Sequence, residues 1–198
     1  ALGNSLRIGF ISTLISTVIG TMIAFAIGRY AFKGRSSVNL LIFLPMATPE
    51  IVLGASLLAM FLNLGINPGF WPTIIAHVMF CISFVVVTVK ARIAGLDPKL
   101  EEAARDLYAN EWETFRRITF PLVLPGVAAA ALLAFALSFD DFIITNFNSG
   151  TVSTFPKFVW VSATRGVPPQ ANVVGSVMFI GALAIVILGQ VVNRRKVR

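Results

Sequence analysis

Long apolar segments alternate with short polar ones along this chain. Five apolar runs are near or above about 18 residues, the length that an α-helix needs to cross a lipid bilayer. Their approximate bounds are 6–27, 38–62, 71–90, 121–147 and 172–192. None of them alternates apolar and polar residues at every second position, as the strands of a membrane barrel do. The pattern therefore predicts an all-α integral membrane protein with about five transmembrane helices.

Small residues recur at every fourth position in two of these runs, which places them on one face of each helix. They are Ser12, Ser16, Gly20, Ala24 and Gly28 in the first run, and Gly126, Ala130, Ala134 and Ser138 in the fourth. Small side chains let two helices approach closely in lipid. Each stripe therefore predicts a helix-packing face.

The segment 91–120 interrupts the apolar pattern and is the most polar part of the chain. Within it, Lys99–Leu107 and Glu111–Thr119 have helix-forming composition, and Asp97-Pro98 is a typical helix start. Both predicted helices carry an apolar side and a charged side. Two interpretations stay open from this pattern: a docking element for another protein, or a solvated connector between two spans.

The composition agrees with a membrane protein, because 57% of the residues are hydrophobic and only 13% are charged, against about 25% charged in soluble domains. The formal net charge is +7, but the basic residues are not spread evenly. Of the sixteen Lys and Arg residues, all but Arg7, Lys157 and Arg165 lie in the segments 29–35, 90–117 and 194–198. Since Lys and Arg accumulate on the cytoplasmic side of a membrane, the polar segment and the carboxyl terminus are predicted to be cytoplasmic. The basic excess is thus a topology signal, and no nucleic-acid partner is expected.

Three carboxylates fall inside predicted spans: Glu50, Asp140 and Asp141. Glu50 follows Pro45 and Pro49, which predict a kink near the middle of the second span. An acid at mid-membrane costs roughly 2.5–3.5 kcal/mol and usually faces a cavity or a partner. Since Arg7 and Lys90 lie at the ends of their spans and the interiors of the spans contain no Lys or Arg, these acids suit a water-filled path for a cationic solute. The alternative is that they cap backbone groups or pair with another subunit, and because successive helical residues are about 100° apart, only one of the two aspartates can face such a path squarely.

His77 and Cys81 lie four residues apart on one face of the third run, and Cys81 is the single cysteine. Two ligands are too few for a structural zinc site, which takes four. We therefore interpret them as packed, neutral side chains and predict no metal site.

The polar segment carries a recognisable pattern. Glu102-Ala103-Ala104, followed by Ile118 and Pro121, resembles the EAA loop of ABC-importer permease subunits. That family has a glycine six residues after the glutamate, where this chain has Tyr108. Tyrosine would be strained at the positive φ that glycine permits, so we expect a different turn or a left-handed Asn110.

The resemblance implies that the EAA segment forms coupling helices that sit in a groove of the ATPase subunit. The ATPase-coupling residues that it implies are Glu101, Glu102, Ala103, Ala104, Arg105, Leu107, Tyr108, Ile118 and Pro121.

The resemblance extends over nearly the whole chain and sharpens to the spermidine/putrescine importer permeases. It is carried by residues 4–6, 28–34, 49–52, 84–89, 137–141 and 165–172. It implies one transmembrane permease domain over residues 1–198 of a bacterial inner-membrane protein, with a cytoplasmic coupling loop at 91–120 and an outer loop at 148–170. Family members usually have one further span before this region. Trp160, in the outer loop, joins Glu50, Asp140 and Asp141 in the expected substrate pathway.

The expected partners follow from the same resemblance. The sequence has no G-x-x-x-x-G-K-[ST] motif, so ATP and magnesium are expected on a separate ABC ATPase dimer, with no cofactor and no enzymatic activity in this chain. A second permease subunit, an extracytoplasmic solute-binding protein and the lipid bilayer are the other expected partners. The alternatives are an importer permease for ferric iron, an anion or an amino acid, and, from another class, an ion-gradient-driven secondary transporter or channel.

Overall fold

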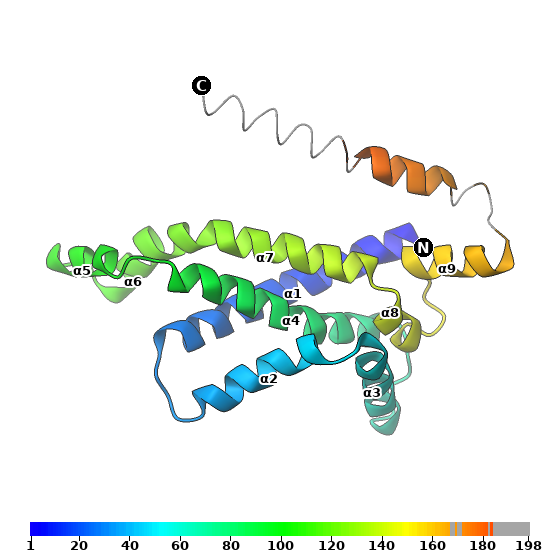
Figure 1. The fold of residues 1–198 in the computed structure, drawn as a ribbon, viewed down its shortest axis with the longest axis horizontal. Coiled ribbons are helices and arrows are strands. Elements are labelled where there is room, and N and C mark those ends of the chain that lie inside the picture. The colour runs from blue at the N-terminus through cyan, green and yellow to red at the C-terminus, as the bar shows by residue number, and fades with distance from the viewer. Residues whose placement is uncertain (167–168, 170–171, 182, 184–198) are drawn as a thin grey trace. The chain divides into compact units, whose positions relative to one another are not determined.

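The computed structural model describes residues 1–166, 169, 172–181 and 183, and every regular element in them is a helix (Figure 1). The elements are α1 (Leu2–Arg29), α2 (Arg35–Ala47), α3 (Glu50–Asn63), α4 (Phe70–Ala94), α5 (Lys99–Asp106), α6 (Glu111–Thr114), the π-helix η1 (Phe115–Thr119), α7 (Phe120–Asp140), α8 (Ile143–Asn148) and α9 (Phe155–Arg165). A further apolar helix covers Asn172–Gly181. The chain divides into two compact units, residues 1–156 and 157–198. The all-α prediction is confirmed, whereas a single domain over 1–198 stays a prediction.

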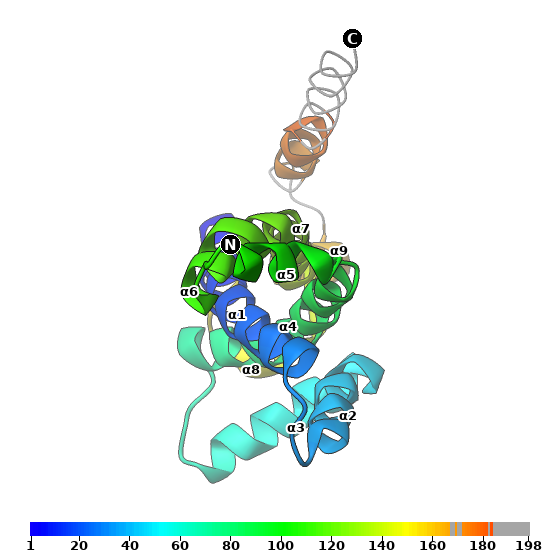
Figure 2. The same cartoon turned by 90° about the vertical axis from the view of Figure 1, so that its left-hand side faces the viewer.

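A bundle of α1, α4 and α7 holds the core of the first unit, and Figure 2 looks along it. Each of these helices comes from an uninterrupted apolar run. Pro121 is the second residue of α7 and directly follows the π-helix η1. The amphipathic segments α5 and α6 lie at one end of the bundle and α8 lies at the opposite end (Figure 1).

The small-residue stripes pack as predicted. Ser12, Ser16 and Ala24 of α1 are fully buried. A Cβ atom added to Gly20 would lie 2.7 Å from Cγ1 of Val85 on α4. The backbone of α1 at Gly20 therefore packs directly against the side chain of Val85. Close packing of this kind supplies the dispersion contacts that hold helices together where lipid removes the hydrophobic driving force.

The second apolar run forms two helices instead of the single kinked span predicted over 38–62. α2 and α3 meet at a bend of 108°. Pro49 precedes the first residue of α3. Thr48 is extended (φ −82°, ψ 131°), because a residue before proline avoids the helical region. α2 packs against α4 and α3 packs against α8, so packing sets the direction that the chain takes after the break.

The predicted count of about five spans stays a prediction. Among the described residues, three helices are long and apolar enough to cross a membrane, or four if the bent pair α2–α3 is one span. The fourth run ends at Asp140 instead of 147, because the chain breaks before α8. Most of the fifth predicted span, 172–192, lies outside the described residues.

Candidate functional site

The first helix of the polar segment, α5, exposes one face and buries part of the other. The Asp97 carboxylate accepts a hydrogen bond from the Lys99 N–H (3.0 Å) just before α5. Glu102 and Ala103 are exposed, whereas Ala104 is buried. The predicted coupling residues are thus divided: Glu102, Ala103, Arg105, Leu107, Tyr108 and Pro121 are exposed, Glu101 and Ile118 are half-buried, and Ala104 is buried.

The turn after α5 is a Schellman motif with tyrosine at the glycine position. Tyr108 adopts φ 60°, its N–H donates to the Arg105 carbonyl (2.9 Å), and the Ala109 N–H donates to the Ala104 carbonyl (3.1 Å). This is the hydrogen-bond pattern that usually places a left-handed glycine after a helix. The expectation of a different turn is therefore wrong, and so is a left-handed Asn110, whose φ is −74°.

Asn110 instead starts the next helix. Its side chain accepts a hydrogen bond from the Glu113 N–H (2.9 Å), and the Glu113 carboxylate accepts one from the Asn110 N–H (3.2 Å). This reciprocal capping box satisfies two N–H groups at the beginning of α6. The helix then continues through the π-turn η1 into α7, so the second predicted coupling helix, Glu111–Thr119, is the first part of a 30-residue helix that ends at Asp140.

Glu101 points away from the exposed face of α5. Its carboxylate pairs with the Arg29 guanidinium at the end of α1 and accepts a hydrogen bond from the Thr119 hydroxyl (2.7 Å). Partial burial raises the pKa of Glu101, but the hydrogen bonds from Arg29 and Thr119 outweigh it and hold the pKa below its usual value. Sequence analysis did not predict this contact, because Arg29 and Glu101 are 72 positions apart.

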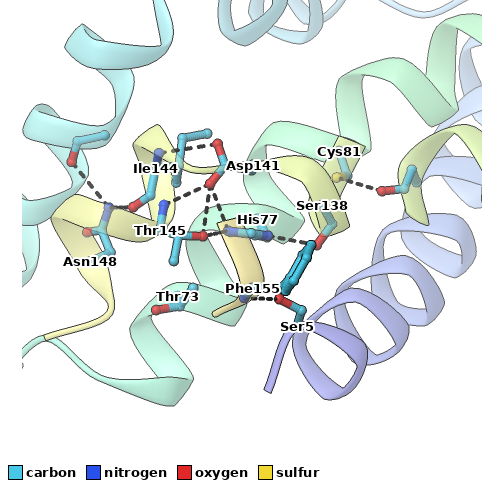
Figure 3. Close-up of polar contacts among 12 residues, drawn as sticks. Ser5, Thr73, His77, Cys81, Ser138, Asp141, Ile144, Thr145, Asn148 and Phe155 are labelled. Atoms are coloured by element: carbon cyan, nitrogen blue, oxygen red, sulfur yellow. Dashed lines mark hydrogen bonds and ion pairs between the residues drawn. The ribbon is translucent and has the colours of Figure 1, made fainter. Parts of the chain in front are cut away.

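At the other end of the bundle, Asp141 fills the break between α7 and α8 (Figure 3). Its carboxylate accepts hydrogen bonds from the N–H groups of Ile144 (3.2 Å) and Thr145 (2.8 Å) and from the Thr145 hydroxyl (2.9 Å). The side chain of Asp141 is almost wholly buried. It therefore caps backbone groups, which was the alternative weighed for the predicted pathway acids.

His77 of α4 completes this polar cluster. It is 1% exposed, and its Nε2 lies 3.3 Å from the Asp141 carboxylate and 2.9 Å from the Thr145 hydroxyl, while Nδ1 lies 2.7 Å from the Ser138 hydroxyl (Figure 3). Because Thr145 donates its proton to Asp141, its oxygen accepts from Nε2–H, and Nδ1 of a neutral imidazole then accepts from Ser138. Each buried polar atom of this chain of contacts has a partner, which offsets its desolvation.

The prediction that His77 and Cys81 are packed side chains is confirmed. Cys81 is fully buried, and its thiol lies 3.5 Å from the Ala134 carbonyl. In the part of the chain that the structure describes, no group of three or more His, Cys, Asp or Glu side chains could hold a metal ion. Sequence analysis missed the contact of His77 with Asp141, although the polar residues Ser138 and Thr145 in an apolar segment were a usable signal.

The other predicted pathway residues are exposed. Glu50 is the first residue of α3 and Asp140 is the last residue of α7. An acid favours the amino-terminal end of a helix and disfavours the carboxyl-terminal end, so helix electrostatics accounts for Glu50 but not for Asp140. Trp160 of α9 is 57% exposed and belongs to the second unit.

Contacts between α3 and α8 connect the chain break before Glu50 with the chain break at Asp140 and Asp141. The Asn148 side chain donates to the Gly54 carbonyl of α3 (3.3 Å). A Cβ atom added to Gly54 would lie 2.9 Å from the Phe147 ring. This close packing of α3 on α8 brings the helix that begins at Glu50 against the one that follows Asp140 and Asp141.

Known proteins of one family resemble this chain over nearly its whole length. Residues 16–197 match the family described as "Binding-protein-dependent transport system inner membrane component". The spermidine/putrescine transport system permease protein PotC of Haemophilus influenzae is 38% identical over 193 residues, which are 97% of this chain and 75% of that protein. The putrescine transport system permease protein PotI of Escherichia coli is 36% identical over 195 residues, 94% of this chain and 69% of that protein.

Solved structures share the fold at low sequence identity. An inward-facing MetNI methionine ABC transporter has a chain that matches with a TM-score of 0.76 at 18% identity, over 96% of this chain and 92% of that one. An amino acid ABC transporter crystallised with histidines matches with a TM-score of 0.73 at 19% identity, over 98% and 91%. The family match, the relatives that align over nearly all of this chain and the shared fold agree: the chain is a multi-pass permease that belongs to the binding-protein-dependent transport system inner membrane component family.

Proposed function

We propose that this chain is a transmembrane subunit of an ATP-driven ABC importer that moves a polyamine, spermidine or putrescine, into the cytoplasm. The observation that carries the proposal is 38% identity to a spermidine/putrescine permease over 97% of the chain. The exposed Asp140 supports a cationic solute, because a cation would offset the unfavourable carboxylate at the end of α7.

The bundle end that carries α5 and α6 faces the cytoplasm in this proposal. The basic residues of segments 29–35 and 90–117 favour that side. The opposite end, with α8 and the acids, then receives the solute from an extracytoplasmic binding protein. A Tyr108→Cys variant in a Cys81→Ser background tests the orientation: an impermeant maleimide is expected to label it in inverted vesicles and not in intact cells, and the reverse result would contradict it.

The exposed residues of α5 and its turn form the surface for an ABC ATPase dimer. Leu107 is 82% exposed and Tyr108 is 97% exposed, and Glu102 and Ala103 lie beside them on α5. Apolar side chains held this far from the core are typical of a contact with another protein. ATP and magnesium belong to that partner, and a second permease subunit completes the pathway.

We assign the pathway acids different tasks. Asp140 and Glu50 are exposed and can attract a cation, whereas Asp141 is engaged by α8 and His77 and holds the break in place. Trp160 is kept as an outer-loop pathway residue, where its ring face can contact an alkylammonium group.

The test is uptake by proteoliposomes that contain the complete complex. Labelled spermidine and putrescine are offered with binding protein outside and ATP inside. Asp140→Asn is expected to raise the concentration needed for half-maximal uptake about tenfold, equivalent to about 1.4 kcal/mol. Lys33→Gln, which removes an exposed charge between α1 and α2, is expected to leave it unchanged. Uptake of an amino acid or ferric iron but of neither polyamine would overturn the substrate assignment.

A further inference from the structure

Three side chains from distant parts of the chain close a triangle at the end of the bundle that carries α5. They are Arg29, the last residue of α1, Glu101 in the first turn of α5, and Thr119, the last residue of η1. The Arg29 guanidinium pairs with the Glu101 carboxylate and donates to the Thr119 hydroxyl (3.3 Å). Thr119 donates in turn to the same carboxylate oxygen (2.7 Å). Each side chain thus contacts the other two.

The ion pair and hydrogen bonds of this triangle connect α5 to the bundle. Ala104 is the one buried residue of α5, and the helix makes its main contacts with α6 and η1, which follow it directly in the chain. Glu101, by contrast, reaches across to α1. Because α1 packs along both α4 and α7, a displacement of α5 that pulls on Arg29 reaches the whole bundle.

The end of α1 also holds the π-turn. Phe25 lies one turn before Arg29, and its ring meets the Phe115 ring edge to face at 5.4 Å. The Arg29 guanidinium lies 5.8 Å from the centroid of the Phe25 ring. Thr119 at the other end of η1 is fully buried. π-turns are uncommon and frequently mark functional positions in helices, and here both ends of the turn contact the last turns of α1.

Glu101 and Glu102 are neighbours with opposite surroundings. Successive residues of a helix are about 100° apart, so Glu101 turns toward Arg29 while Glu102 stays exposed on α5. Glu102 is available to a partner protein. Glu101 is already engaged within this chain, although the sequence grouped both as ATPase-coupling residues.

We propose that Arg29, Glu101 and Thr119 form an internal link that transmits movement of the coupling helix α5 to α1, in parallel with the covalent path through η1 and α7. The inference rests on the proposed importer function. Arg29 and Glu101 are positioning residues in this scheme, because they act on the solute path through the helices that they join. Breaking the link lets α5 move without moving α1, so ATP hydrolysis continues with less transport.

The test measures solute imported per ATP hydrolysed by the complete complex in proteoliposomes. Glu101→Gln and Arg29→Gln are each expected to lower this ratio about three- to tenfold, equivalent to about 0.7–1.4 kcal/mol of lost coupling, while ATP hydrolysis is retained. The exchanged pair Arg29→Glu with Glu101→Arg is expected to restore most of the ratio. Lys33→Gln removes an exposed charge from the turn between α1 and α2, four residues after Arg29, and is expected to leave the ratio unchanged.

Two results would overturn the link: an unchanged ratio in Glu101→Gln, or the same loss in Lys33→Gln. The ratio is measured with whichever solute the wild-type complex imports, so a wrong substrate assignment leaves this test intact. Amide hydrogen exchange on the purified full chain in lipid nanodiscs tests the link without transport. Residues 99–106 are expected to exchange about three- to tenfold faster in Glu101→Gln, with residues 70–94 unchanged, and unaltered exchange in α5 would refute the proposal.

Discussion

Replacing Tyr108 tests whether its left-handed backbone is strained. A non-glycine residue at φ 60° pays roughly 1–2 kcal/mol for the contact between its Cβ and the neighbouring carbonyl. Glycine removes that cost but loses about 0.5–1 kcal/mol more backbone entropy on folding. The Tyr108 side chain is 97% exposed, so the substitution forfeits almost no buried surface. Tyr108→Gly is therefore expected to stabilise the turn by about 0.5–1 kcal/mol.

The assay is amide hydrogen exchange at the turn. The Ala109 N–H, which donates to the Ala104 carbonyl (3.1 Å), reports when the Schellman motif opens. A stabilisation of about 0.5–1 kcal/mol slows its exchange about two- to fivefold. Tyr108→Ala serves as the matched control, since alanine keeps a Cβ and is expected to exchange as the wild type does. Tyr108→Val adds a β-branch and is expected to exchange faster.

The reasoning fails if Ala109 exchanges at the wild-type rate in Tyr108→Gly, or if Tyr108→Val is as protected as the wild type. Either result would mean that the backbone at Tyr108 is not strained, or that the ring stabilises the turn in a way that its exposure does not suggest. An equal gain in Tyr108→Ala and Tyr108→Gly would point to the loss of the exposed ring, since only glycine relieves the backbone.

The remaining predictions concern packing, the buried polar cluster and pH. Gly20→Ala places a Cβ 2.7 Å from Val85 and should lower the free energy of unfolding by about 1–3 kcal/mol, seen as a lower melting temperature; an unchanged melting temperature would contradict close contact. His77→Ala leaves the buried Asp141 carboxylate without one partner and should cost about 3 kcal/mol, whereas Cys81→Ala should cost less, and equal losses would argue against the polar cluster. Because the pKa of Glu101 is lowered from 4.5, its contribution is complete above that pH and lost as the pH falls through the lowered value. Exchange in α5, corrected for the intrinsic pH dependence, should rise there in the wild type but not in Glu101→Gln.

Several features of this protein could be predicted from the sequence because local composition determines them. An apolar run that is long enough to cross the bilayer, and that does not alternate like a barrel strand, must form a helix to satisfy its backbone groups. α1, α4 and α7 occupy three of the predicted runs. The stripes of small residues predicted which faces pack, since a four-residue period is the helix period itself. The pattern at Glu102, Ala103 and Ala104 predicted the family, which the comparisons confirm, whereas the coupling role of this segment stays a prediction.

The tertiary structure decided what depends on residues far apart in the chain. Pro45 and Pro49 predicted a kink in the second apolar run, but packing of α3 on α8 sets the 108° bend between α2 and α3. The contacts of Asp141 with His77 and with the first turn of α8 also appear only in the tertiary structure, because no periodicity connects α4 with that break. Tyr108 keeps the left-handed conformation of the family's glycine because the hydrogen bonds around it outweigh its local preference. The side chains of Arg29 and Glu101 meet across 72 positions. Spacing along a chain identifies the neighbours on one helix, whereas contacts between helices arise only when the whole bundle packs.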